Sequence, residues 1–141
     1  MPETSYTPRI AVTLGDPRGI GPEVTRAALA DPQLAGAADF VVLGPEPGSL
    51  NSPLRLPKAA EYHVTGTWSG GGEREAGEHS ALAIERAISM ALAGDVDGLV
   101  TAPIAKTALR AAGYDFPGPV SYTHLRAHET TASISYAVFC L

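Results

Sequence analysis

The sequence has a single cysteine, few aromatic residues and no long apolar run. Cys140 has no second cysteine to pair with, so an internal disulfide is excluded. Aromatic residues make up 6% of the 141 residues, which favours helices packed on a sheet over an all-β sandwich. Because the apolar runs are short and residues 1–9 contain no charged segment followed by an apolar one, we expect no membrane span and no secretory signal. A cytoplasmic protein is the simplest interpretation.

Positive charge is also scarce. The chain has 10 Lys and Arg residues against 15 Asp and Glu residues, which gives a net charge of -5, and it has no basic block. This balance argues against a nucleic-acid partner. The apolar content of 45% is sufficient for a hydrophobic core, and a chain of this length suits one domain.

The first informative pattern is an apolar run, residues 10–14, that leads into a glycine-rich loop. The run contains β-branched residues and predicts a buried parallel strand. Pro22 suits the first turn of a helix, where its missing N–H leaves no bond unmade. The sequence therefore predicts a strand, a loop and a helix over residues 24–30.

This loop has two interpretations, and the loop alone does not separate them. It can hold an anion or a reactive carbonyl at the start of the helix, or it can be a tight turn that binds nothing. Glycines at these positions allow backbone conformations and close approaches that a Cβ would prevent. The candidate ligand-binding residues of the loop are Gly15, Asp16, Gly19, Gly21 and Glu23.

The rest of the pattern predicts an α/β fold with a parallel sheet. The apolar run at residues 40–43 and the short segments 61–64 and 99–101 are expected strands. A long amphipathic helix is expected over residues 76–93 and a short one over residues 106–112. Strands that alternate with helices are typical of parallel sheets with right-handed crossovers.

The helical and strand periods also predict which way individual side chains face. We expect Val24, Ala27 and Ala28 on the apolar face of the first helix, and Leu82 on that of the long helix. His79 and its neighbour Ser80, near the start of the long helix, could face a ligand, and solvent is the default expectation. His63 is expected to be a partly exposed strand residue rather than a ligand.

Thr101 and Lys106 form a second candidate site. Thr101 ends a predicted strand and Lys106 begins the helix that follows it. Because ligands of parallel sheets bind outside the carboxyl ends of the strands, this turn and the glycine loop are expected on one edge. A hydroxyl and a positive charge there could hold a phosphate or carboxylate. The alternative is that Thr101 only ends a strand and that Lys106 is solvated.

Two long motifs then resemble one known family. Residues 13–23 (Thr-Leu-Gly-Asp-Pro-Arg-Gly-Ile-Gly-Pro-Glu) and residues 97–106 (Asp-Gly-Leu-Val-Thr-Ala-Pro-Ile-Ala-Lys) are similar to segments of 4-hydroxythreonine-4-phosphate dehydrogenases. The helical segment 84–88 and the Phe-Pro-Gly at residues 116–118 agree with the same family, in the same order. The resemblance covers roughly residues 9–118, which correspond to the opening part of a full-length family member.

The resemblance implies an isocitrate/isopropylmalate dehydrogenase-like fold and a homodimer with a shared active site. The implied reaction is NAD-dependent oxidation of a phosphorylated hydroxy acid and metal-assisted decarboxylation, in pyridoxal phosphate biosynthesis. The cofactors so implied are NAD and a divalent metal ion, whose histidine ligands lie further along the family's chain. Catalytic residues are accordingly expected outside this chain. Ala105 stands where the family usually has Asn, which could mark a side branch with a related substrate.

After Phe-Pro-Gly the family continues with His-Thr-Glu, whereas this chain has Pro-Val-Ser at residues 119–121. We therefore divide the chain into residues 1–118, the N-terminal part of a dehydrogenase domain, and residues 119–141, a tail that is not family sequence. The expected partner is a phosphorylated small molecule, and the truncated chain is expected to be inactive. Two alternatives remain: a sister dehydrogenase of a sugar-acid phosphate, and a non-catalytic module that binds a phosphorylated metabolite.

Overall fold

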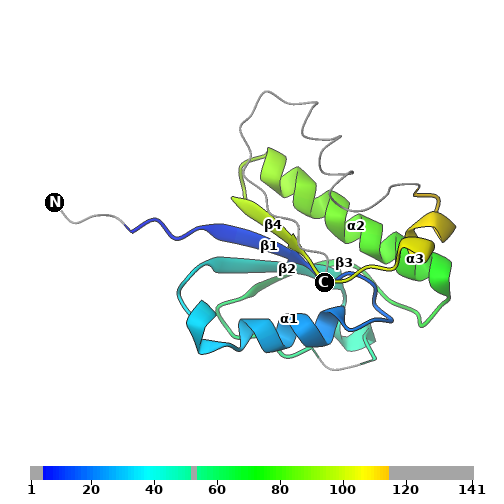
Figure 1. Cartoon of the computed structure of the whole chain (residues 1–141), viewed down its shortest axis with the longest axis horizontal. Helices are drawn as coiled ribbons and strands as arrows, with labels where there is room; N and C mark the ends of the chain where they lie inside the picture. Colours follow the sequence, from blue (N-terminus) through cyan, green and yellow to red (C-terminus); the bar gives the residue numbers. More distant parts are fainter. Residues whose placement is uncertain (1–4, 52–53, 115–141) are drawn as a thin grey trace.

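The computed structural model describes residues 5–51 and 54–114, and the structural statements below concern these residues. Their centre is a four-stranded sheet with the strand order β3-β2-β1-β4, in which every neighbouring pair is parallel (Figure 1). The strands are β1 (Arg9–Thr13), β2 (Asp39–Pro45), β3 (Glu61–Gly66) and β4 (Gly98–Thr101). The predicted parallel α/β fold is confirmed.

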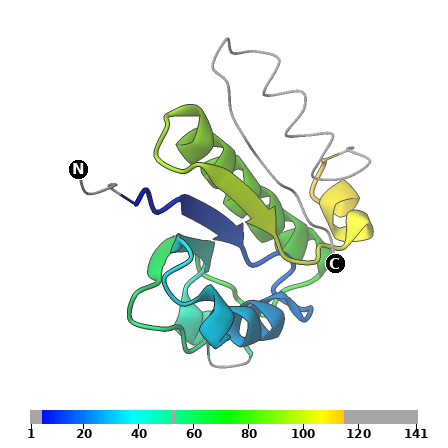
Figure 2. The same ribbon diagram turned by 60° about the vertical axis from the view of Figure 1, so that its left-hand side comes forward.

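Helices cover both faces of this sheet. The helices are α1 (Gly21–Leu29), α2 (Glu73–Leu92) and α3 (Lys106–Ala111), with 3-10 turns η1 (Pro32–Leu34) and η2 (Pro47–Ser49). Helix α1 lies on one face of the sheet, and α2 lies on the other, with α3 beside α2 (Figures 1 and 2). No helix in the described part of the chain is long and apolar enough to cross a membrane.

The strands divide their side chains between these two faces, as the alternation of a strand requires. One buried cluster packs under α2 and contains Ala11, Leu43 and Leu99. A second cluster, on the opposite face, contains Val12 and Val42. The central strands β1 and β2 are therefore apolar on both sides, which explains the near-continuous apolar runs in their sequences.

The orientation predicted for α1 is wrong in part. Ala27 and Ala28 are exposed, and the buried residues of the helix are Gly21, Pro22 and Thr25. Gly21 and Thr25 lie about one turn apart and form the stripe that contacts the sheet, which turns Ala27 outward. A cavity of about 270 Å³, lined by apolar residues that include Ala28, lies between the helix and the sheet.

Helix α2 also differs from its prediction at three side chains. Leu82 is 44% exposed, although the helical period places it on the apolar face. His79 and Ser80 are buried instead of facing solvent, because α3 and the segment around Trp68 pack on this end of α2. The Ser80 hydroxyl donates to the carbonyl oxygen of Ala76 at 2.8 Å, which satisfies it inside the helix. His63 is partly exposed, as expected.

The contact between α2 and α3 depends on Gly77. A Cβ at this position would lie 1.9 Å from the carbonyl oxygen of Ala108, so only glycine allows α3 to approach this closely. This contact positions α3, which begins with Lys106.

We predict that Gly77→Ala lowers the free energy of unfolding by about 2 kcal/mol, because backbone atoms of α3 have to move away. The measurement is urea denaturation followed by circular dichroism. Gly48→Ala is the control, since an added Cβ there lies 3.7 Å from its nearest neighbour, a flexible Glu46 oxygen. Equal stabilities of the two variants would contradict the proposed role of Gly77.

Candidate functional site

The loops that follow β1 and β4 meet at the carboxyl edge of the sheet. Strand β1 pairs with β4 so that Thr13 is opposite Thr101, which brings the two strand ends together. The amide of Ala102 donates to the Thr13 carbonyl oxygen at 2.9 Å, and the amide of Asp16 donates to the Pro103 carbonyl oxygen at 3.2 Å. The structure thus places both predicted loops side by side.

Gly15 is required by this contact, and Gly21 is required by the close packing where α1 begins. Gly15 has φ +75°, and a Cβ there would lie 2.2 Å from the Pro103 carbonyl oxygen. At Gly21 a Cβ would lie 1.8 Å from the Leu14 carbonyl oxygen, which would push α1 away from the sheet. Gly19 has no such constraint, because its nearest neighbour would be 3.5 Å away. The close packing of protein against protein is sufficient to explain Gly15 and Gly21.

Asp16 organises the loop from inside. It is 4% exposed, and its Oδ1 accepts hydrogen bonds from the Arg18 amide at 2.8 Å and from Arg18 Nε at 3.2 Å. Its Oδ2 accepts from a terminal guanidinium nitrogen of Arg18 at 2.9 Å. The amides of Asp16, Arg18 and Gly19 all donate to protein acceptors, so these three are engaged within the protein.

Arg18 is a residue of this edge that the sequence analysis missed. Its guanidinium is partly exposed, and the hydrogen bond to Asp16 raises its pKa, so a permanent positive charge lies at the loop surface. The signal was present in the sequence as an acidic and a basic residue on either side of Pro17. Proline restricts the backbone between them, which favours contact between their side chains.

Thr101 and Lys106 differ in their accessibility. Thr101 is 1% exposed and has interactions within the protein. Lys106 is exposed at the first residue of α3, and no described residue forms a hydrogen bond or ion pair with its side chain. Glu23 is exposed on the first turn of α1. Of the second candidate pair, only Lys106 is therefore available at the surface to contact a ligand.

A buried aromatic pair lies next to the second loop and was also not identified from the sequence. The rings of Trp68 and His79 meet edge to face with centroids 5.9 Å apart, and Trp68 packs against Ala105 and Ala108. Within the described residues, Trp68 Nε1 and His79 Nδ1 are buried without a hydrogen-bond partner. The single tryptophan of the chain was the available signal.

The described residues do not fit a divalent metal ion. Among residues 5–51 and 54–114, no group of three or more His, Cys, Asp or Glu side chains could hold one. Asp16, the buried carboxylate of the edge, is already paired with Arg18. No metal-dependent step is therefore assigned to this part of the chain.

Comparison with known proteins agrees with these motifs. The family model described as pyridoxal phosphate biosynthetic protein PdxA matches residues 32–138. The chain belongs to the PdxA family. The matched range extends beyond residue 118, and the division of the chain at that residue stays a prediction.

Relatives of this family are dehydrogenases. The chain is 37% identical over 139 residues to the 4-hydroxythreonine-4-phosphate dehydrogenase of a Synechocystis species, covering 86% of this chain and 39% of the relative. It is 32% identical over 160 residues to the D-threonate 4-phosphate dehydrogenase of Pectobacterium atrosepticum, covering 92% of this chain and 46% of that protein.

The chain is also similar to solved structures of such dehydrogenases. A crystal structure of 4-hydroxythreonine-4-phosphate dehydrogenase from Klebsiella pneumoniae matches with a TM-score of 0.65 and 31% identity. The match covers 90% of this chain and 46% of that structure. The chain therefore spans less than half the length of these members of the PdxA family.

We predict that Gly21→Ala lowers the free energy of unfolding by about 2 kcal/mol or more, because its Cβ collides with backbone. Gly19→Ala is the matched control in the same loop and should change stability by less than about 0.5 kcal/mol. Chemical denaturation of both variants measures the difference. A destabilised Gly19→Ala beside a native-like Gly21→Ala would contradict the packing explanation.

We also predict that Asp16→Ala lowers the free energy of unfolding by about 2 kcal/mol, since it removes both an amide acceptor and the partner of a guanidinium. Asp31→Ala is the control: Asp31 likewise accepts from a backbone amide two residues on, at 2.9 Å, but is exposed. The Asp31→Ala substitution should lower the free energy of unfolding by about 0.5 kcal/mol. If thermal or chemical denaturation shows the same loss of unfolding free energy for both variants, the Arg18 contact contributes nothing to stability.

Proposed function

We propose that this chain is the N-terminal part of an NAD-dependent dehydrogenase of a phosphorylated hydroxy acid. In this proposal residues 15–23 and 101–106 form one wall of the substrate cleft. The observation that carries it is the contact between the two loops through the Asp16 amide and the Pro103 carbonyl oxygen. This contact holds Arg18 and Lys106 on one edge of a parallel sheet, where ligands of such folds bind.

The chemistry of the relatives' substrates supports an anion site at this edge. The names 4-hydroxythreonine-4-phosphate dehydrogenase and D-threonate 4-phosphate dehydrogenase share a hydroxy acid with a phosphate at position 4. The Lys106 ammonium is exposed and has no partner among the described residues, so it is available to a phosphate or carboxylate oxygen. Arg18 lies on the neighbouring loop, where its guanidinium is paired with Asp16.

The same proposal includes the family's wider properties. NAD would accept the hydride released when the substrate hydroxyl is oxidised. The complete protein would have the isocitrate/isopropylmalate dehydrogenase-like fold, act as a cytoplasmic homodimer in pyridoxal phosphate biosynthesis, and obtain its divalent metal ligands from residues beyond this chain. Gly15, Asp16 and Gly21 would shape the cleft wall, Gly19 and Glu23 would lie at its surface, and Thr101 would support the second loop from beneath.

A second candidate is a sister dehydrogenase that acts on another sugar-acid phosphate. It is favoured by Ala105, which precedes Lys106 at a position where the resembling family has a polar Asn. An alanine there removes a hydrogen-bonding group beside the exposed lysine, which would change how a substrate hydroxyl is recognised.

For the 141-residue chain we predict no NADH formation from either 4-phosphate substrate, with NAD and Mg²⁺, Mn²⁺ or Zn²⁺ present. The physical reason is that the described residues supply no metal ligand set. Absorbance at 340 nm measures the product. Metal-dependent turnover by this chain would contradict the assignment of the catalytic residues to a missing part.

A binding measurement tests separately whether Lys106 belongs to the wall of the substrate cleft. Lys106→Ala should weaken binding of D-threonate 4-phosphate about tenfold, measured by calorimetry, because a charge-assisted contact to the phosphate is lost. Lys58→Ala is the matched control, since Lys58 is the only other lysine and is exposed in the segment before β3. Equal affinities of the two variants would exclude Lys106 from the site.

A further inference from the structure

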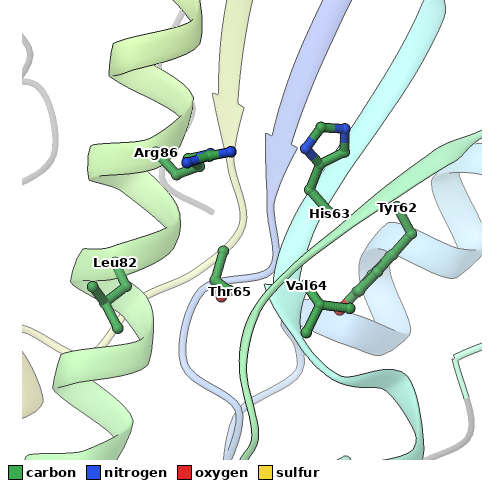
Figure 3. Close-up of a pocket in the computed structure, with 6 residues that line it drawn as sticks. All are labelled: Tyr62, His63, Val64, Thr65, Leu82 and Arg86. Atoms are coloured by element: carbon green, nitrogen blue, oxygen red, sulfur yellow. The ribbon is translucent and has the colours of Figure 1, made fainter.

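A second pocket lies beside the outer strand β3, between β3 and α2. Its volume is about 510 Å³, within the range of small-molecule sites. Lys106 follows β4, the outer strand on the other side of the described sheet, so the two places are separate. The pocket is lined by Tyr62, His63, Val64, Thr65, Leu82 and Arg86 (Figure 3).

Two polar side chains converge on this pocket from two elements. His63 and Thr65 are two residues apart on β3, so they share one face of the strand. Arg86 extends from α2. Figure 3 shows Arg86 and His63 pointing toward one another across the pocket, whereas the Thr65 oxygen points away from both.

The hydrogen-bonding capacity of these groups is largely unused. Arg86 forms no hydrogen bond or ion pair with any described residue, and its guanidinium can donate in a planar fork. The Thr65 hydroxyl is buried and has no partner within the described part of the chain. Because this oxygen is inaccessible, it does not contact a ligand in the pocket, whereas the exposed Arg86 guanidinium can.

The acidic residue on this face of β3 is already neutralised. Glu61 accepts from a terminal nitrogen of Arg9 at 2.8 Å, and its other oxygen lies 2.6 Å from His63 Nε2. The hydrogen bond with His63, together with Arg9, lowers the pKa of the Glu61 carboxyl. Because the carboxylate occupies Nε2, the other ring nitrogen of His63 is left facing the pocket and Arg86 (Figure 3).

An apolar side chain completes the rim of the pocket. Leu82 is 44% exposed, although it is a large apolar residue. Leu82 lies one helical turn before Arg86, so the cation and the apolar surface are adjacent on the same side of α2. The pocket therefore offers one end for an anion and one for an uncharged body.

We propose that this pocket binds a small phosphate monoester. The Arg86 guanidinium holds the phosphate oxygens, the free ring nitrogen of His63 donates when protonated, and Leu82 contacts the ester group. A guanidinium fork matches the geometry of phosphate oxygens, and the neutralised Glu61 does not repel them. This site is independent of the function proposed above, since it shares no residue with the Lys106 edge.

The test is an amide NMR titration of the 141-residue chain with inorganic phosphate and with phenyl phosphate, at constant ionic strength. The expected result is saturable shifts in β3 and in α2 around Arg86 for both ligands, with phenyl phosphate binding several-fold more tightly. Shifts that do not saturate, or that are confined to the loops around Lys106, would overturn the proposal.

Variants separate the anion end from the apolar end. Arg86→Gln should weaken the binding of both ligands about tenfold. Leu82→Gln should remove the advantage of phenyl phosphate while inorganic phosphate still binds. Arg26→Gln, on α1 at the opposite face of the sheet, and Lys106→Ala are the controls and should leave these shifts unchanged.

Two outcomes would refute the assignment of residues. One is an Arg86→Gln spectrum that retains the native dispersion and binds phosphate as the unaltered chain does. The other is an equal loss in Arg26→Gln, which would indicate a general charge effect. If the spectrum of Arg86→Gln loses its native dispersion, Arg86→Lys is used instead, because it keeps the positive charge. Arg86→Lys should bind inorganic phosphate several-fold more weakly than the unaltered chain. An unchanged affinity would exclude a role for the guanidinium fork.

Discussion

The close contact between the backbones of two loops is the constraint on which this structure depends. The Pro103 carbonyl oxygen lies almost where a side chain at Gly15 would be, and the Leu14 carbonyl oxygen lies where one at Gly21 would be. Because these positions lack side chains, the loop after β1 can contact the loop after β4, and α1 can start against the sheet. The two motifs that identify the PdxA family are therefore two halves of one contact, and the exposed Lys106 is positioned by it.

Which charged side chains are available at the surface depends on which of them form ion pairs, and not on the net charge of -5. Asp16 is buried against Arg18 at one edge of the sheet, and Glu61 is shared by Arg9 and His63 at the other. These contacts neutralise carboxylates near both edges. Lys106 and Arg86 are left without partners among the described residues. An acidic chain can thus leave single cationic side chains without an acidic partner at separate places on its surface.

Glycine has different roles along this chain, although all glycines look alike in the sequence. Gly15, Gly21 and Gly77 are each placed where a Cβ would collide with a backbone oxygen, so each permits two elements to pack. Gly19 lies in the same motif as Gly15 and Gly21 but has open space around it. A glycine-rich motif therefore does not by itself indicate that a ligand approaches the backbone. Here protein atoms occupy that space at two of the three positions.

The sequence alone determined the parallel α/β fold, the approximate bounds of its strands and helices, the family, and the meeting of residues 15–23 and 101–106 at one edge. The fold, the element bounds and the meeting of the two loops follow from local periodicity, turn residues and the chirality of βαβ units, which act within short segments, whereas the family follows from the resemblance of the motifs. Which side chains are accessible was decided by tertiary packing. The burial of His79 and the exposure of Ala27 and Leu82 depend on how the helices rotate, and this depends on contacts between segments far apart in the chain.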